Sequence, residues 1–407
     1  MRMPCGTGAV PTLLSARRVP LAALSAAALL LGCGDPPGAP TEDPTDIPAA
    51  AAAAVPAGAL TWRMVSVGGS HVCGVTTDDR AYCWGSSGNG RLGDGQLFGS
   101  RLRPNAVLGN LRFQHVSAGA FHTCGLAVDG RIYCWGWNPY GALGDGSTAI
   151  RTAPVPVLTS MKFKQVRVGD YHSCAINLAG AAYCWGLGEG GILGNGTTTN
   201  RLSPVKVAGG LTWTGLSASG PQTCGVSTAH RAYCWGTNSL GALGNGGVGP
   251  NLRPAPVSGG LPFRQVETTY AHTCGVTTAD LAYCWGDNQV GQLGDGTTTQ
   301  RFVPSLVVGN RKYQLINANG AQSCAITLAG RGFCWGVRVD RLATFAWTKV
   351  PVRVPGDLTW RQLRAGSADC GVATGGKAWC WGNNSSGMLG NGTLTSSEVP
   401  VPVGPPL

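Results

Sequence analysis

The residues best suited to chemistry in this 407-residue chain are its cysteines. Fourteen of the sixteen fall into seven pairs whose members are ten residues apart. The pairs are Cys73/Cys83, Cys124/Cys134, Cys174/Cys184, Cys224/Cys234, Cys274/Cys284, Cys324/Cys334 and Cys370/Cys380. Such pairs can form disulfides, bind zinc or remain as buried free thiols. The separation matches none of the short spacings of zinc ligands, so we favour seven disulfides.

Histidine precedes the first cysteine of a pair by two residues in four places. The position is occupied in chain order by His71, His122, His172, Gln222, His272, Gln322 and Ala368. A ring of metal ligands would not accept glutamine and alanine, whereas a structural hydrogen bond would accept glutamine. We therefore interpret these histidines as structural and predict no metal site.

Aspartate or asparagine follows a Leu-Gly dipeptide in six places, at Asp94, Asp145, Asn195, Asn245, Asp295 and Asn391. A calcium loop needs more oxygen ligands than one side chain per segment, and the exchange of Asp for Asn is typical of turns. Four arginines, each three residues before a proline, could form an anion-binding ring: Arg101, Arg151, Arg201 and Arg301. A local ion pair with the preceding aspartate is the interpretation that we prefer.

Catalytic motifs are lacking in the sequence. It contains no phosphate-binding glycine loop, no nucleophile elbow and no His-Glu-x-x-His helix. We therefore predict no catalytic residue and no cofactor. Charged residues make up only 12% of the chain, and the net charge of +11 is spread along it, which favours solubility and an anionic partner or surface.

A repeat of about 50 residues must position these side chains. Cys-Trp-Gly occurs seven times, starting at Cys83, Cys134, Cys184, Cys234, Cys284, Cys334 and Cys380. One copy predicts four short strands, at residues 113–118, 122–128, 131–135 and 154–157. The 64 glycines exclude a helical bundle. Four strands per repeat predict an all-β fold, a seven-bladed β-propeller of antiparallel blades.

The hairpin of each repeat has a testable register. With a three-residue loop centred on Asp129, Cys124 lies opposite Cys134, and Gly125 lies opposite Tyr133. Every repeat then places a small residue opposite an aromatic one, and directly opposed cysteines come close enough for a disulfide. The residue after the loop centre is of a type that tolerates positive φ: Asp79, Gly130, Gly180, His230, Asp280, Gly330 and Gly376.

The repeat resembles a known family. The pattern Val116-Ser117-Ala118-Gly119-x-x-His122-Thr123-Cys124, followed by residues 129–136 and Asn138-x-x-Gly141-Ala142-Leu143-Gly144, is similar to the regulator of chromosome condensation repeat. The resemblance covers residues 60–407 and implies a seven-bladed propeller. It also implies a possible activity, guanine-nucleotide exchange on a small GTPase.

Two departures from the repeat stand out. The sixth unit lacks the Asn-x-x-Gly-x-Leu-Gly segment after Trp335, and the last unit is shorter. The sequence begins mid-unit at 60–62 and ends with a strand at 399–403, so we expect the C-terminal strand to complete the blade begun at the N-terminus. Such a clasp would close the ring with N- and C-terminal strands.

The N-terminal residues predict export. Arg17 and Arg18 precede a thirteen-residue apolar run at 19–31, which is too short to span a bilayer and is typical of a signal peptide over residues 1–32. Leu30-Leu31-Gly32-Cys33 resembles a lipoprotein cleavage site, so Cys33 is predicted to carry lipid. Residues 33–59 form a Pro/Ala-rich linker. We expect a membrane-anchored protein of the outer membrane or cell surface, the alternative being simple secretion.

The loops after the first and third strands of a blade emerge on one face, where the repeats differ most. Exposed aromatic residues there are typical of contacts with a protein or a sugar: Phe121, Trp137, Tyr140, Tyr171 and Tyr270. The alternative is that these rings only pack on neighbouring loops. We predict a non-catalytic, monomeric binding module for a protein or glycan of the cell envelope, and no nucleic acid. An exported hydrolase or lyase would instead need a close carboxylate pair in the central channel.

Overall fold

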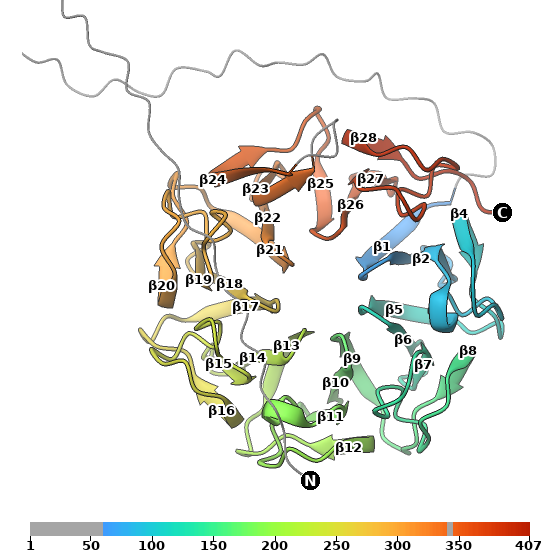
Figure 1. Cartoon of the computed structure of the whole chain (residues 1–407), viewed down its shortest axis with the longest axis horizontal. Coiled ribbons are helices and arrows are strands. Elements are labelled where there is room, and N and C mark those ends of the chain that lie inside the picture. The colour runs from blue at the N-terminus through green and yellow to red at the C-terminus, as the bar shows by residue number, and fades with distance from the viewer. Residues whose placement is uncertain (1–59, 340–344) are drawn as a thin grey trace, which may run out of the picture. The chain divides into compact units, whose positions relative to one another are not determined.

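The computed structural model describes residues 60–339 and 345–407, which form seven four-stranded sheets arranged in a ring (Figure 1). The predicted seven-bladed β-propeller is therefore confirmed. The signal peptide, Cys33 and the linker, predicted for residues 1–59, lie outside the described residues. Within the described residues, no helix has the length and apolar character needed to cross a bilayer.

Each blade uses four consecutive strands, from the channel to the rim. The innermost strands are β1 (Trp62–Val67), β5 (Phe113–Ala118), β9 (Phe163–Val168), β13 (Trp213–Ser219), β17 (Phe263–Thr268), β21 (Tyr313–Asn319) and β25 (Trp360–Arg364). The second strands are β2 (His71–Thr76), β6 (His122–Ala127), β10 (His172–Asn177), β14 (Gln222–Ser227), β18 (His272–Thr277), β22 (Gln322–Thr327) and β26 (Ala368–Ala373). The third strands are β3 (Ala81–Ser86), β7 (Ile132–Gly136), β11 (Ala182–Gly186), β15 (Ala232–Gly236), β19 (Ala282–Gly286), β23 (Gly332–Val339) and β27 (Ala378–Gly382). The outer strands are β4 (Ser100–Ala106), β8 (Arg151–Pro156), β12 (Arg201–Lys206), β16 (Asn251–Pro256), β20 (Arg301–Leu306), β24 (Phe345–Arg353) and β28 (Ser397–Pro402).

Two short 3-10 turns, η1 (Gly88–Gly90) and η2 (Glu189–Gly191), lie in the loops after β3 and β11. The outer strand of the second blade begins at Arg151, three residues before the predicted start. Its pairing with β7 is irregular between Cys134 and Gly136, which the period of the sequence does not reveal.

The predicted hairpin register is confirmed in the second blade, where Cys124 pairs with Cys134 and Gly125 with Tyr133. All seven disulfides are present, and no cysteine of these pairs is more than 4% exposed. The seven turn residues predicted to need positive φ all have it, including the non-glycine residues Asp79, His230 and Asp280. Local turn chemistry therefore fixes the register of every hairpin.

The core consists of seven apolar layers between neighbouring blades. In one of them, Val75 and the Cys73–Cys83 disulfide of the first blade pack against Phe113 and Trp135 of the second. Both faces of each sheet are thus covered, as the bulky residues on the two faces of the hairpin predict. A closed ring is the arrangement that gives every blade two such neighbours.

The small residue opposite each aromatic one is explained by a second ring in the same blade. A methyl group added to Gly74 would lie 2.5 Å from the Trp62 ring, and one added to Gly125 would lie 2.4 Å from the Phe113 ring. The small residue therefore makes room for the ring at the start of the innermost strand of its own blade.

The predicted clasp is wrong. The C-terminal strand β28 pairs with β27 of its own blade, and β1 to β4 form a complete first blade. The ring closes by packing, with Trp62 and Trp84 of the first blade against Met388 and Leu389 of the last. The Trp84 indole also donates to the Met388 carbonyl, at 2.8 Å. A shared blade is unnecessary because the repeat boundaries coincide with the blade boundaries.

Candidate functional site

The loop face, formed by the loops after the first and third strands of each blade, brings four of the five predicted aromatic residues together. Phe121 and Tyr171 stack with ring centroids 5.3 Å apart and an interplanar angle of 21°. The Trp137 ring lies 5.3 Å from Phe121, 5.7 Å from Tyr140 and 5.7 Å from Tyr171. We call these four residues, which lie at the junction of blades two and three, the aromatic patch.

Backbone and amide hydrogen bonds hold the aromatic patch in place. The N–H of Trp137 donates to the carbonyl of Phe121 across 3.0 Å, which ties the two loops of the second blade together. The next residue, Asn138, is fully buried, and its side chain accepts from the Leu143 N–H and donates to the Ser147 carbonyl. Hydrogen bonds within the loop therefore fix the conformation of the segment that carries Trp137 and Tyr140.

Arg91 supports the aromatic patch and was not among the residues predicted from the sequence. Its guanidinium lies 5.7 Å from the centre of the Phe121 ring and donates to the carbonyls of Gly88 and Ala120. Arg91 is only 7% exposed, and burial lowers its pKa. A cation over one ring face stabilises that ring and leaves its other face to Tyr171. Only the alignment of loops from neighbouring repeats would have revealed it.

The four rings are half-buried, so each keeps part of its surface in solvent. The mutual packing agrees with the expectation that such rings contact adjacent loops, and the remaining exposure leaves a surface for a partner. Burial raises the pKa of the Tyr171 hydroxyl, followed by the effects of Asp170 and Tyr140, so this hydroxyl stays a neutral hydrogen-bond donor at physiological pH. Rigid rings with polar tips are the usual anchors of protein interfaces.

Tyr270, the fifth predicted aromatic residue, is not part of the aromatic patch. It lies at the junction of blades four and five, where its carbonyl accepts from the Gln222 amide at 3.2 Å. Its side chain is near Gly220 of the neighbouring loop and is 61% exposed. The structure thus divides the predicted residues into one group of four and a separate exposed tyrosine.

The structural role predicted for the histidines is confirmed. Each of the four is fully buried, and its Nε2 lies 2.7–2.8 Å from a Ser or Thr hydroxyl of the next blade. That hydroxyl donates in turn to a loop carbonyl in the histidine's own blade, as Thr123 does to the carbonyl of Arg91. The glutamines at this position also bond across the junction, Gln222 to Tyr270 and Gln322 to Asp369.

Turn chemistry also explains the repeated Asp and Asn residues. Asp145 accepts from the backbone and hydroxyl of Ser147, and Asp295 does the same with Thr297. Their carboxylates pair with Arg151 and Arg301, both at 2.9 Å, and Asp94 pairs with Arg101 at 2.8 Å. The local ion pairs predicted for these arginines are confirmed. Arg201 follows an asparagine instead, and its buried Nε has no partner among the described residues.

The missing segment of the sixth repeat leaves a cavity of about 510 Å³ between blades six and seven. At five junctions the segment supplies a carbonyl to the Cys-Trp-Gly tryptophan of the following blade, as Ala142 does to Trp185, whereas Trp335 makes no such bond although the fifth repeat has the segment. In the described chain Trp381 has no such partner and lines the cavity instead, together with Gln322 and Asp369.

The protein is a propeller built from sequence repeats. It has seven of them in a closed ring, each with the Cys-Trp-Gly signature. Models of the regulator of chromosome condensation (RCC1) repeat match residues 78–126, 129–176, 179–225 and 280–326, and a second model of this repeat matches 113–142, 163–191 and 263–292. The chain belongs to the RCC1 repeat family. The resemblance in the second repeat is therefore confirmed.

Curated relatives match this chain over short segments. The ultraviolet-B receptor UVR8 of Arabidopsis thaliana is 37% identical over 94 residues, which are 23% of this chain and 21% of the receptor. RCC1 domain-containing protein 1 of Mus musculus is 36% identical over 86 residues, which are 21% of this chain and 22% of that protein. The matched segments thus span about a fifth of each relative.

Solved structures show the same fold at low sequence identity. Human WBSCR16 has a TM-score of 0.71 and 20% identity, covering 80% of this chain and 94% of that one. Prp20p of Saccharomyces cerevisiae, whose structure was reported with its binding to Gsp1p and histones, also has a TM-score of 0.71 and 20% identity, covering 81% and 87%. These likenesses concern the fold alone.

Proposed function

We propose that this protein is a non-catalytic binding module that holds a protein partner on its loop face through the aromatic patch. The observation that carries the proposal is the convergence of Phe121, Trp137, Tyr140 and Tyr171, from three loops of two blades, into one half-exposed cluster. Aromatic rings fixed by their own packing lose little conformational entropy on binding, which makes them effective anchors.

The compartment that fits the module is oxidising and outside the cytoplasm. Seven disulfides in one domain are typical of exported proteins, since cytosolic reductants keep thiols reduced. The lipid on Cys33, with anchoring at the outer membrane or cell surface, remains part of this proposal. So do a monomeric state and the choice of protein over glycan.

Guanine-nucleotide exchange is the second candidate function and comes from the family alone. The disulfides favour the binding module over it, because a small GTPase would be met in the reducing cytosol. A hydrolase or lyase gains little support from the channel. There the Glu267 carboxylate contacts Gln265, Ser217 and Arg364, and none of these contacts is a second carboxylate.

Affinity capture from a cell-envelope extract tests the proposal, with the wild-type protein compared against Trp137→Ala plus Tyr140→Ala. We expect the double variant to recover at least tenfold less of one protein than the wild type does, since each anchor ring contributes on the order of 1–2 kcal/mol of binding free energy. Val128→Ala plus Leu178→Ala provides the control, because these exposed side chains lie in hairpin turns at the other end of the ring and should leave capture unchanged.

Further arms separate the remaining alternatives. Tyr270→Ala tests whether the isolated tyrosine belongs to the same surface, and a glycan array tests sugars directly. Equal recovery by the wild type and the double variant, with unchanged near-UV circular dichroism, would show that the loop face is not the binding surface. Loss of binding to a glycan instead of a protein would assign the aromatic patch to sugars.

A further inference from the structure

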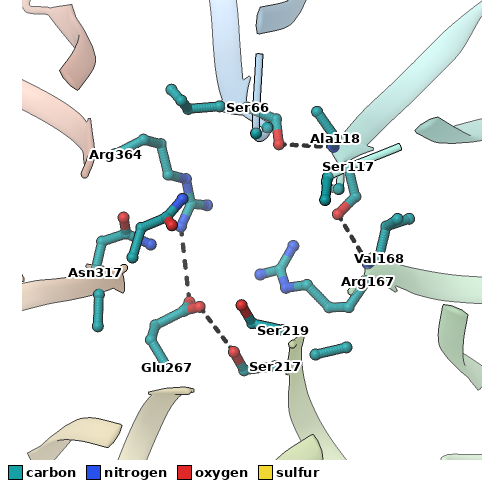
Figure 2. Close-up of a pocket in the computed structure, with 18 of the residues that line it drawn as sticks. Ser66, Ser117, Ala118, Arg167, Val168, Ser217, Ser219, Glu267, Asn317 and Arg364 are labelled. Carbon is teal, nitrogen blue, oxygen red and sulfur yellow. Dashed lines mark hydrogen bonds and ion pairs between the residues drawn. The ribbon is translucent and has the colours of Figure 1, made fainter. Parts of the chain in front are cut away.

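The central channel has its own ring of side chains, one from each innermost strand. The position paired with the first cysteine of each disulfide points into the channel, and in chain order it holds Ser66, Ser117, Arg167, Ser217, Glu267, Asn317 and Arg364 (Figure 2). We call these residues the channel ring. They line a cavity of about 120 Å³, more than the space that one water molecule needs.

Several residues of the channel ring accept a hydrogen bond from the next blade. The Ser66 and Ser117 hydroxyl oxygens accept from the backbone N–H groups of Ala118 and Val168 in the next blade, at 3.0 and 3.1 Å. The Asn317 side-chain oxygen accepts in the same way from Ala365, at 2.7 Å. The hydroxyl protons and the amide NH₂ of these residues remain as hydrogen-bond donors toward the channel. Among the described residues, the hydroxyl protons of Ser66 and Ser117 have no acceptor.

Two guanidinium groups add to these donors. Figure 2 shows Arg167 and Arg364 reaching into the open centre from opposite sides. The Arg167 Nε donates to the Leu216 carbonyl at 3.1 Å, and its Nη1 donates to His115 Nε2 at 2.8 Å. Burial, with the two guanidinium groups, lowers the pKa of His115 well below its usual value, so its imidazole is a neutral acceptor. Both partners of Arg167 are thus uncharged, and its positive charge stays in the channel.

One carboxylate of the channel ring faces these two cations. Glu267 accepts from Ser217 at 3.1 Å and from Gln265 at 3.1 Å, while Arg364 lies 3.7 Å away, beyond hydrogen-bond distance. The other carboxylate along the channel, Asp170, lies toward the loop face, and burial raises its pKa. The channel ring itself thus holds two guanidinium groups and one carboxylate, which is already hydrogen-bonded, so the ring carries a net positive charge.

The cavity continues toward the other end of the ring, which carries the hairpin turns. An adjoining space of about 480 Å³ shares Arg167, Glu267 and Arg364 with the channel ring and is also lined by Arg63 and Arg361. Arg63 is paired with Asp79, whereas Arg361 donates to the backbone carbonyls of Trp62 and Arg63, so the Arg361 charge attracts an anion from the turn end toward the guanidinium groups of the ring.

We propose that the channel ring binds an oxyanion, a carboxylate or phosphate group of a small molecule, between Arg167 and Arg364. Planar guanidinium groups match the oxygens of both anions, and Ser66, Ser117 and the Asn317 amide supply further donors. This site is separate from the aromatic patch, since none of the four residues of the patch lines the channel cavity or the adjoining space.

Isothermal titration calorimetry of the full-length protein, at fixed ionic strength in chloride, tests the proposal with inorganic phosphate in one arm and malonate in the other. Binding in either arm identifies which oxyanion the site takes. Arg364→Gln should weaken that binding by roughly tenfold, the usual effect of losing one charge-assisted hydrogen bond. Glu267→Gln should strengthen it, because the competing carboxylate is removed.

The opposite signs of the two variants keep the test independent of folding. A variant that only disturbed the fold would weaken binding in both cases, and circular dichroism reports the fold directly. Arg112→Gln is the matched control, since this exposed arginine lies in a blade connection and should bind like the wild type. Absence of heat in both arms, or unchanged affinity in Arg364→Gln and Glu267→Gln, would overturn the proposal.

Discussion

At the scale of single residues, the buried histidines decide how the protein responds to acid. Burial is the main cause that lowers the pKa of His122 and His272 to about 3 and that of His172 to about 4. In the unfolded chain a histidine has a pKa near 6.5. Between these values the unfolded state binds more protons than the folded state, so the free energy of unfolding falls as the pH falls from about 6.5 toward 3. Above about 6.5 the full stability is present.

His122→Gln tests this relation with a residue that the chain itself uses at this position in blades four and six. We expect a free energy of unfolding within about 1 kcal/mol of the wild type at pH 7. Between pH 6.5 and 4 the variant should lose stability less steeply, by up to ~1.4 kcal/mol per pH unit. Denaturant unfolding over this pH range measures both quantities. The reciprocal change, Gln222→His, should steepen the dependence, and equal slopes in all three proteins would contradict the assignment.

At the scale of the blade, the aromatic side chain at the start of the innermost strand determines which residue can lie beside it in the second strand. Tryptophan faces glycine, as Trp62 faces Gly74, whereas Ala175 fits beside Phe163 in the third blade. We expect Gly74→Ala to lower the free energy of unfolding by about 1–3 kcal/mol through overpacking. Gly125→Ala, whose added methyl group would lie as close to the Phe113 ring, should cost a similar amount. A loss well below about 1 kcal/mol in both variants, measured by denaturant unfolding, would mean that the ring does not exclude the methyl group.

The disulfides also act within single blades. Each closes a short loop, so replacing Cys174 and Cys184 together by alanine should lower the free energy of unfolding by about 2–3 kcal/mol. In denatured, unreduced wild-type protein the fourteen propeller cysteines should not react with a thiol reagent. A count near fourteen would refute the oxidised state and with it the proposed compartment.

At the scale of the whole molecule, the weakest junction is not the one between the chain ends. Blades one and seven share the Trp84–Met388 hydrogen bond and a continuous apolar layer, while blades six and seven enclose the 510 Å³ cavity. We expect amide hydrogen exchange in β26 and β27 to be faster than in β2 and β3, because local opening is easiest where packing is poorest. Faster exchange in β1 to β3 would place the weak junction at the termini.

Local features of the fold followed from the sequence because they depend on neighbouring residues. The pairing of Gly125 with Tyr133 and the positive φ of His230 need only the hairpin period and turn chemistry. Contacts between repeats could not be predicted from the sequence in this way. Arg91 supports Phe121 from the preceding blade, and the channel ring depends on which strand is innermost. The cavity beside Trp381 required knowledge of what the missing segment normally covers.

The position of the five aromatic residues on one face could be predicted because the variable loops of a propeller stand out against the repeat. The convergence of four of them could not, since it depends on the stacking of Phe121 and Tyr171 across a blade junction. The clasp was predicted from the ends of the chain, but the structure completes each blade from one repeat.

The coincidence of blade and repeat boundaries has a consequence for how this protein can change over evolution. Because each of the seven described sheets is built from four consecutive strands, duplication or deletion of one fifty-residue unit in the gene would add or remove an intact sheet, with both of its apolar faces ready to stack. Rings of a different size, and rearranged chains whose new ends fall between two units, are therefore within a single genetic event of this one.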